Sequence, residues 1–357
     1  MDKLDLHING FKCFVDKHFE LSNMTLLTGA NASGKSSVVQ ALLFLINASE
    51  SKETNRALSL ENPRYAFDFG TPDSLINNEL KSDEVTISLP AGIAMKFYGG
   101  KQEEARKLFV EIDGLPELKN LFEGGLTYLT AERQGPRYEY VRKTSYEDGC
   151  GCRGENTGNV MADNWNTRIS GKRLLSSSEQ QGLFNVALDN WLNYIFPGVK
   201  IYVQQRGAQS YQVLIRESFH NFQTDSTNIG FGISYALPIL VGALLAKDRG
   251  WLIVENPEAH IHAKAQSNMG YFLGMMAAAG LRVVVETHSE HIVNGIRRAA
   301  IISGRLKPEE VNIYFFKGKS ESELITVDEY GNLSDFPVDF FDQSRQDMLE
   351  IINKTHE

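Results

Sequence analysis

Short apolar runs recur along the chain, and several are followed by longer segments rich in apolar residues. The runs at 24–28, 251–254 and 282–285 predict buried strands, and the segments 37–46 and 263–278 predict helices that follow two of them. Unbroken apolar strands that alternate with helices are typical of a parallel sheet covered on both faces. The pattern therefore predicts an α/β fold built on a mainly parallel sheet.

Other strands alternate apolar and polar residues, which indicates strands with one solvated face. These predict an additional antiparallel strand layer, with edge strands at 4–8 and 19–21, a strand pair at 85–89 and 94–98 and a hairpin at 199–203 and 211–215. Another strand is expected at 126–131, ending in a polar turn where α/β proteins place ligand contacts. Further helices are expected at 181–196 and 233–246. The second of these is almost entirely apolar, but it contains Pro238 and is too short to span a bilayer.

Composition changes along the chain and suggests three parts. Residues 49–78 are polar and rich in Asn, Gly and Pro, so we expect an irregular excursion there. Residues 137–173 carry seven basic and five acidic residues and five glycines, which indicates a basic insertion with mobile parts. We expect a first lobe over 1–136, the insertion with a helical and hairpin part over 137–225, and a second lobe with an acidic tail over 226–357.

The overall charge limits the partners and the compartment. A net charge of −9 gives no general attraction to nucleic acid, although a local basic patch remains possible. Three cysteines in 357 residues favour a reducing compartment, and the first residues do not resemble a signal peptide. We expect a cytoplasmic protein with no membrane contact.

Residues 29–36 read G-A-N-A-S-G-K-S and follow the P-loop pattern G-x-x-x-x-G-K-S. A predicted strand precedes the motif and a predicted helix follows it, which is the context that a P-loop requires. Backbone N–H groups and the helix N-terminus would hold phosphates, with Lys35 at the β- and γ-phosphates and Ser36 on Mg²⁺. The loop residues expected to contact ATP are Asn31, Ala32, Ser33, Gly34, Lys35, Ser36 and Ser37.

Polar residues follow two of the predicted buried strands. Glu255 ends the strand at 251–254 and could hold Mg²⁺ directly or through water. His288 follows the strand at 282–285 and could bond a γ-phosphate or position water. Gly230-x-Gly232 precedes a helix, and its N–H groups could bind a phosphate from a second subunit.

Taken together, these segments resemble the ABC-type ATPase heads of the SMC and RecF kind. The resemblance is strongest to the OLD-like branch encoded in bacterial defence and DNA-maintenance operons. It is carried by residues 11–14, the P-loop, 230–234 as a divergent signature, 254–262 as Walker B and D-loop, and 286–289 as the switch. It implies a P-loop NTPase of two lobes and a head-to-head dimer that holds ATP and Mg²⁺. Lys12, Ser234 and Gln134 would join the nucleotide site, with Gln134 as the candidate Q-loop residue and Mg²⁺ ligand.

The chain departs from these heads in two ways. It has no long coiled coil, so a DNA-bridging arm is not expected. Asn256 stands where such heads place the glutamate that acts as general base, and an amide orients water but accepts no proton. Glu258 or His288 would then have to help, and we expect slow hydrolysis. No nuclease motif follows residue 300, so cleavage would belong to a partner.

Several alternatives remain open at this stage. His260-x-His262 and His288-x-x-His291 could suggest a metal site, but no Cys or acid completes either set. Cys150-x-Cys152 has too short a spacing for a zinc knuckle. Residues 137–173 could contact nucleic acid, although such a segment is more often a solvated loop. The tail from 320 to 357 has ten acids and two bases and is expected to be solvated surface.

Three functions fit these features. The first is a dimeric ATP switch that controls a neighbouring-gene effector, such as a nuclease, in anti-phage defence. The second is a DNA-repair or chromosome-maintenance ATPase. The third is a nucleotide-binding assembly scaffold with little turnover.

Overall fold

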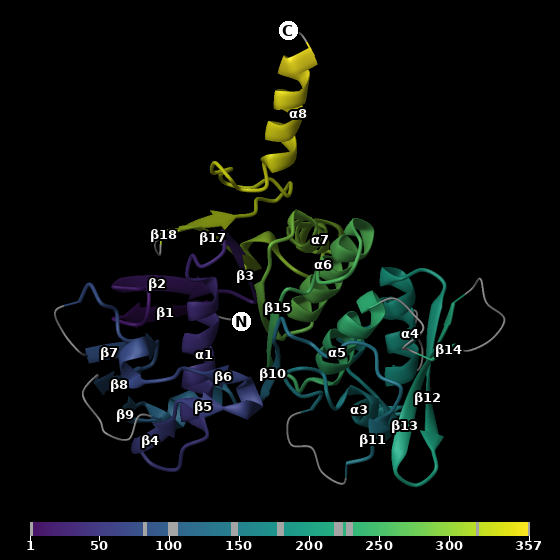
Figure 1. Cartoon of the computed structure of the whole chain (residues 1–357), viewed down its shortest axis with the longest axis horizontal. Coiled ribbons are helices and arrows are strands. Elements are labelled where there is room, and N and C mark those ends of the chain that lie inside the picture. Colours follow the sequence, from purple (N-terminus) through teal and green to yellow (C-terminus); the bar gives the residue numbers. More distant parts are fainter. Residues whose placement is uncertain are drawn as a thin grey trace.

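The computed structural model describes residues 3–80, 84–98, 106–143, 149–176, 182–217, 224–225, 231–318 and 321–355. Its centre is a six-stranded sheet in the order β10-β15-β16-β3-β17-β18, parallel except for the edge strand β18 (Figure 1). The strands are β10 (Leu126–Leu129), β15 (Trp251–Glu255), β16 (Arg282–Glu286), β3 (Met24–Gly29), β17 (Val311–Gly318) and β18 (Glu321–Thr326). The mainly parallel sheet predicted from the apolar runs is confirmed.

Successive residues of this sheet enter two different cores, because side chains alternate across a strand. Leu26, Val254 and Val285 pack into the core that contains the helices of the second half of the chain. Leu27, Ile253 and Val284 pack into the other core, with the P-loop helix. Both faces of the sheet are therefore buried, which explains why its strands are apolar without interruption.

The first core contains a layer of helices. These are α3 (Thr157–Asn164), α4 (Phe184–Ile195), α5 (Phe231–Leu245), α6 (Ala263–Ala278) and α7 (Glu290–Ile302). Helices α6 and α7 approach closely because glycines lie at their contact: a Cβ added to Gly295 would lie 2.0 Å from the Ser267 carbonyl oxygen. This close packing fixes the start of α7, which follows the predicted switch.

The second core joins α1 (Lys35–Ser49) and α2 (Leu115–Leu121) to an antiparallel sheet in the order β2-β1-β7-β8-β9-β4. Its strands are β1 (Leu4–Asn9), β2 (Asp16–Leu21), β4 (Asn55–Ser59), β7 (Glu84–Leu89), β8 (Ile93–Tyr98) and β9 (Lys107–Asp113). The predicted antiparallel layer is thus present. The short strands β5 (Glu61–Asn62) and β6 (Phe67–Asp68) pair beside it.

A third sheet has the order β11-β13-β12, and β14 pairs with β13. Its strands are β11 (Tyr140–Val141), β12 (Val199–Arg206), β13 (Ser210–Glu217) and β14 (Thr224–Asp225). The hairpin expected near 199–215 is β12 and β13, paired from Val199↔Glu217 to Arg206↔Ser210.

Two expectations from composition are wrong. Residues 49–78 are not an excursion outside the core, because β4 joins the antiparallel sheet and Leu58, Tyr65 and Phe67 are buried. The segment 137–173 is not only a solvated loop. Cys150, Val160 and Met161 lie in the core, and a Cβ added to Gly154 would lie 2.5 Å from the Pro238 ring. The polar composition of these segments did not predict their burial, because a few large apolar residues in each segment pack into the core. Residues 144–148 of the insertion lie outside the described part.

The C-terminal helix α8 (Gln343–Thr355) projects away from the rest of the molecule (Figure 1). It carries exposed Met348, Leu349 and Ile351. None of the described helices is both long and apolar enough to cross a lipid bilayer. The sheets do not divide at residue 136, since β3 and β10 lie beside β15 and β16 in the same sheet. The three-part division remains a prediction.

Candidate nucleotide site

The P-loop connects β3 to α1 through a turn that depends on two glycines. Gly29 has φ +127° and Gly34 has φ +112°, values that L side chains rarely adopt. A Cβ on Gly29 would also lie 2.2 Å from the Phe316 carbonyl oxygen of β17. A cavity of about 300 Å³ lies over the loop, lined by Lys12, Cys13, residues 31–37, Glu286 and His288. The structure thus gathers the predicted loop residues around one cavity.

Lys35 is buried in the mouth of this loop. Its ammonium donates hydrogen bonds to the carbonyl oxygens of Gly29, at 3.1 Å, and Ala30. Burial lowers the Lys35 pKa, and Glu286 opposes that shift. Neutral carbonyls solvate the ammonium without cancelling its charge, so Lys35 can exchange them for anionic phosphate oxygens.

Glu286 is a site residue that sequence reasoning missed. It ends β16, directly beside Glu255 in the parallel register, and the Ser36 hydroxyl donates to its Oε1 at 2.9 Å. Its Oε2 is buried with no hydrogen-bond partner. Burial first, and then Glu255, raises the Glu286 pKa to about 7. The signal was available, because Glu286 and Glu255 occupy equivalent ends of neighbouring strands.

These oxygens fit a magnesium ion. A hydroxyl and two neighbouring carboxylates beside the P-loop are the hard oxygen ligands that Mg²⁺ prefers. The unpartnered Oε2 of Glu286 is a buried acceptor that a cation would satisfy. The predicted set was Ser36, Glu255 and Gln134. The structure places Ser36 in contact with Glu286, with Glu255 as the next carboxylate.

Glu255 is held at the end of β15 by donors from β10 and the residues after it. It accepts hydrogen bonds from the Tyr128 hydroxyl at 2.8 Å, the Ala131 N–H at 3.1 Å and the Thr130 hydroxyl at 3.4 Å. Burial and the Glu255 charge raise the Tyr128 pKa, so this phenol stays a proton donor. The carboxylate is therefore fixed in direction rather than free to rotate.

Glu258 ties the turn after β15 to the switch after β16. Its Oε2 accepts from the Thr287 hydroxyl and its Oε1 from the His288 N–H, both at 2.8 Å. The Asn256 amide lies 3.5 Å from Glu258 Oε1. Burial first, and then Lys35, lowers the His288 pKa, so the imidazole is neutral at neutral pH. Glu255, Asn256, Glu258 and His288 thus lie along one edge of the sheet.

Buried Arg133 joins this edge to α5. Its guanidinium donates to the carbonyl oxygens of Glu255 at 2.6 Å, Asn256 at 2.7 Å and Tyr235 at 3.1 Å. A fourth bond reaches Thr130 at 2.9 Å. Burial lowers the Arg133 pKa to about 10, which leaves it charged. We did not select Arg133 from the sequence, because an arginine in a polar turn carries no sign of burial.

The remaining predicted site residues are distributed as follows. Lys12 lies at the P-loop cavity, with its ammonium 2.6 Å from Gln40 Oε1 and 4.7 Å from the Phe69 ring centroid. Gln134 lies in a separate hollow with Phe231, and its buried amide oxygen has no partner. Gly232 packs against the turn after β15, since a Cβ there would lie 2.7 Å from the His260 carbonyl oxygen. Ser234 follows on α5, and Gly230 lies outside the described residues.

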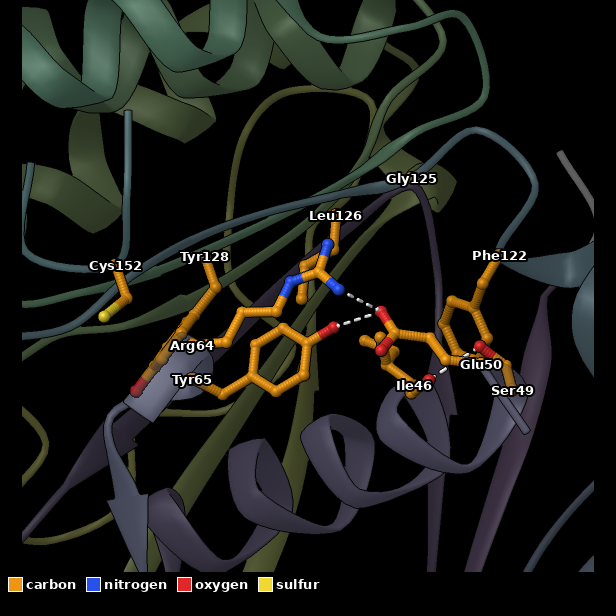
Figure 2. A pocket seen from close by; sticks show the side chains of 10 residues that line it. All are labelled: Ile46, Ser49, Glu50, Arg64, Tyr65, Phe122, Gly125, Leu126, Tyr128 and Cys152. Carbon is orange, nitrogen blue, oxygen red and sulfur yellow. Dashed lines mark hydrogen bonds and ion pairs between the residues drawn. The ribbon is translucent and has the colours of Figure 1, made fainter. Parts of the chain in front are cut away.

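A second cavity, of about 120 Å³, lies at the far end of α1 (Figure 2). Glu50 Oε1 accepts from Arg64 at 2.7 Å and from the Tyr65 hydroxyl at 2.8 Å across it. Tyr128 borders this cavity and also holds Glu255. Its small volume, and the pairing of its charged groups with one another, indicate a gap in the packing rather than a nucleotide pocket.

The predicted alternatives find little support among the described residues. None of His260, His262, His288 and His291 belongs to a cluster of three metal-ligating groups there. Cys150 and Cys152 are buried thiols that form no disulfide, and burial raises the Cys150 pKa to about 12. Arg173 bonds the carbonyl oxygens of Leu244, at 3.1 Å, and Ala246 at the end of α5. Nucleic-acid contact through 137–173 stays a prediction.

Comparisons with known proteins bear on the family and the fold of the chain. A family model described as an AAA domain matches residues 5–228, and a second, described as a protein of unknown function (DUF3696), matches residues 306–351. The search of the curated proteins found no match.

Solved structures show the same fold at low sequence identity. One is the SmcHead bound to the C-winged helix domain of ScpA, with a TM-score of 0.54 at 11% identity over 92% of this chain and 98% of that chain. Another is the Smc head domain with an extended coiled coil bound to the C-terminal domain of ScpA from Pyrococcus furiosus, with a TM-score of 0.52 at 9% identity over 99% of both chains. The chain thus has an SMC-head-like α/β fold, and the predicted fold class is confirmed.

Proposed function

The chain belongs to the AAA domain family, and from this premise we propose that it is a switch ATPase that binds ATP and Mg²⁺ at the P-loop. The observation that carries the proposal is the convergence of Lys35, Ser36 and Glu286 on one cavity, with Glu255 on the adjacent strand. P-loop chemistry requires groups that bind the phosphates, a bound cation and a carboxylate held in a fixed position.

Each residue has a proposed role in hydrolysis. The N–H groups of residues 31–37 and the Lys35 ammonium would bind the phosphates. Ser36, Glu286 and Glu255 would hold Mg²⁺, which supplies positive charge against the transferring phosphoryl group. Neutral His288 would hydrogen-bond the γ-phosphate, with its backbone fixed by Glu258. Lys12 and Gln134 remain proposed nucleotide contacts.

We propose slow turnover because Asn256 cannot accept a proton. Its amide would orient the attacking water, while general-base help is typically worth about 10²–10⁴-fold in rate. Glu258 is occupied by Thr287 and His288, so its carboxylate contributes mainly by holding the switch. Such a site would keep ATP bound longer than an ordinary hydrolase.

The proposal extends to a dimer. The P-loop cavity is open, and the start of α5 exposes 58% of Phe231 in the same molecule. In a head-to-head pair, the signature residues Gly230, Gly232 and Ser234 of one copy would close over ATP bound to the other. ATP would then act as the clamp between two copies.

The partner proposal rests on the resemblance to the OLD-like family. We propose a cytoplasmic anti-phage defence role in which the ATP-bound dimer controls an effector from a neighbouring gene, with nuclease chemistry supplied by that effector. The nucleotide state would decide whether the effector is held or released.

The test measures ATP binding and partner capture together. Replacing Lys35 by Ala removes an ammonium–phosphate contact worth about 1.5–3 kcal/mol, so ATP affinity should fall roughly tenfold to hundredfold. Wild type and Lys35→Ala are titrated with ATP and then co-purified with the products of adjacent genes, with and without Mg-ATP. Unchanged ATP binding by Lys35→Ala would contradict the proposed nucleotide site. Partner capture that does not depend on ATP would contradict the proposed switch.

A further inference from the structure

Four polar side chains gather on the outer face of the β1–β2 hairpin, away from the P-loop cavity. The strands pair with His7 opposite His18, Asp5 opposite Glu20 and Asn9 opposite Asp16. Because side chains alternate across a strand, Asp5, His7, Asp16 and His18 lie on one face. The intervening Leu6, Ile8 and Phe19 are fully buried on the other. The hairpin therefore presents two histidines and two aspartates as one exposed cluster.

The two imidazoles are stacked, with ring centroids 4.0 Å apart and planes 4° from parallel. His7 Nε2 lies 2.5 Å from Asp16 Oδ1. One ligand atom from each of His7, Asp16 and His18 lies within 4.8 Å of the others. Tetrahedral bonds of about 2.0–2.2 Å to N and O ligands place such atoms somewhat over 3 Å apart, so the two rings would tilt out of their parallel stack to bring all three atoms onto one ion.

Asp5 completes the arrangement. Its Oδ2 accepts from His18 Nδ1 at 2.8 Å, which leaves Nε2 as the metal-binding nitrogen of that ring. A carboxylate that accepts the second ring N–H of a ligating histidine fixes its tautomer and orientation.

We propose that His7, His18 and Asp16 form a binding site for a divalent transition ion of the zinc class, with Asp5 as the positioning residue and water as the fourth ligand. Two imidazoles and one carboxylate suit Zn²⁺, Co²⁺ or Ni²⁺ better than Mg²⁺ or Ca²⁺, which prefer oxygen alone. This site is separate from the proposed Mg²⁺ site of the P-loop.

The position of the hairpin gives such an ion a structural effect. The loop between β1 and β2 carries Lys12 and Cys13, which line the P-loop cavity. An ion held by both strands would clip them together just before that loop. Side chains of the site are 31–60% exposed, so an ion can enter and leave without unfolding the sheet.

The test titrates the full chain with Zn²⁺ in saturating Mg²⁺, and Co²⁺ absorption reports the ligand geometry. We expect one ion per chain and a higher melting temperature on addition of Zn²⁺. His7→Ala combined with His18→Ala should lower affinity at least a hundredfold. Asp5→Asn should lower it about tenfold, because it acts only through His18.

The matched control replaces His260 and His262, the other two-histidine motif, by Ala and should leave zinc binding unchanged. Circular dichroism confirms the fold of each variant, and none of the replaced side chains is buried. No zinc binding by the wild type, equal binding by the His7/His18 variant, or loss of binding only in the control pair would each overturn the proposal. In the first two cases, the four residues would only form hydrogen bonds with one another at the protein surface.

Discussion

At the scale of single residues, the charge of the site depends on two carboxylates that lie close together at the ends of neighbouring parallel strands. Glu286 has its pKa raised to about 7 because burial and Glu255 disfavour its charged form. Between the ordinary value of 4.5 and about 7, the folded chain binds more protons at Glu286 than the unfolded chain. The free energy of unfolding therefore falls as pH rises through this window.

Replacing Glu286 by Gln should remove this dependence. In the absence of Mg²⁺ and nucleotide, the wild type should lose roughly 2–3 kcal/mol of stability from this group between pH 4.5 and 7. Urea unfolding at a series of pH values measures the loss. His288 contributes a slope of opposite sign, because its pKa is lowered, so the difference between wild type and Glu286→Gln isolates Glu286. Parallel curves for the two proteins would contradict the assignment.

The role of Asn256 can be tested by replacing it with a residue that can act as a general base. Asn256→Glu should raise ATP turnover by about 10²-fold, the lower end of general-base effects. The gain is limited because residue 256 has φ +44° and a longer side chain there costs about 1–2 kcal/mol. Steady-state phosphate release measures the rate, with Asn256→Asp as the shorter control. Unchanged turnover in a variant with normal ATP affinity would show that Asn256 does not limit the reaction.

At the scale of elements, Arg133 connects β15, the residues after β10 and helix α5 through backbone carbonyl oxygens. Arg133→Lys keeps the charge but cannot span four acceptors with one ammonium. We expect a loss of about 2–3 kcal/mol in the free energy of unfolding, because buried carbonyls lose their partners. Turnover should fall further than ATP affinity, since the P-loop is untouched.

Chemical denaturation and phosphate release provide the two measurements. Arg153→Lys is the control, because Arg153 is half exposed and its pair with Glu132 contributes little. Equal effects of the two substitutions would mean that the hydrogen bonds of Arg133 contribute no more to stability than the exposed pair of Arg153.

The elements that sequence predicted well are those whose apolar pattern is continuous. The predicted strand at 251–254 and helix at 263–278 correspond to β15 and α6, because the strand is buried over 251–254 and most of the helix is buried between Ala265 and Ala277. The P-loop, Glu255 and His288 could be chosen for the same reason, since each follows a buried strand. Glu286 also ends a buried strand and could have been chosen in the same way, whereas Arg133 could not, because its role depends on partners far away in sequence. The packing of 49–78 depended likewise on distant neighbours.

At the scale of the whole molecule, the proposed clamp predicts association that depends on nucleotide. Mg-ATP should shift the mass measured by light scattering from one chain to two. Ser234→Arg should block this shift while ATP affinity stays near the wild-type value, because Ser234 lies on α5 and not at the P-loop cavity. Lys35→Ala should block both. Dimers that form equally without ATP would contradict the clamp.

The contact between Gly29 and β17 limits how these two parts of the chain can be exchanged between related proteins in evolution. The carbonyl oxygen of Phe316, far along the chain, occupies the space that any side chain at Gly29 would need, and β17 lies directly beside β3. Strand β17 therefore supplies one wall of the P-loop turn, and the block 306–351 that contains it also includes the start of the projecting helix α8. A recombination event that exchanged this block between relatives would exchange part of the P-loop's support with it. A change that moved the Phe316 backbone toward β3 would disturb the turn at Gly29.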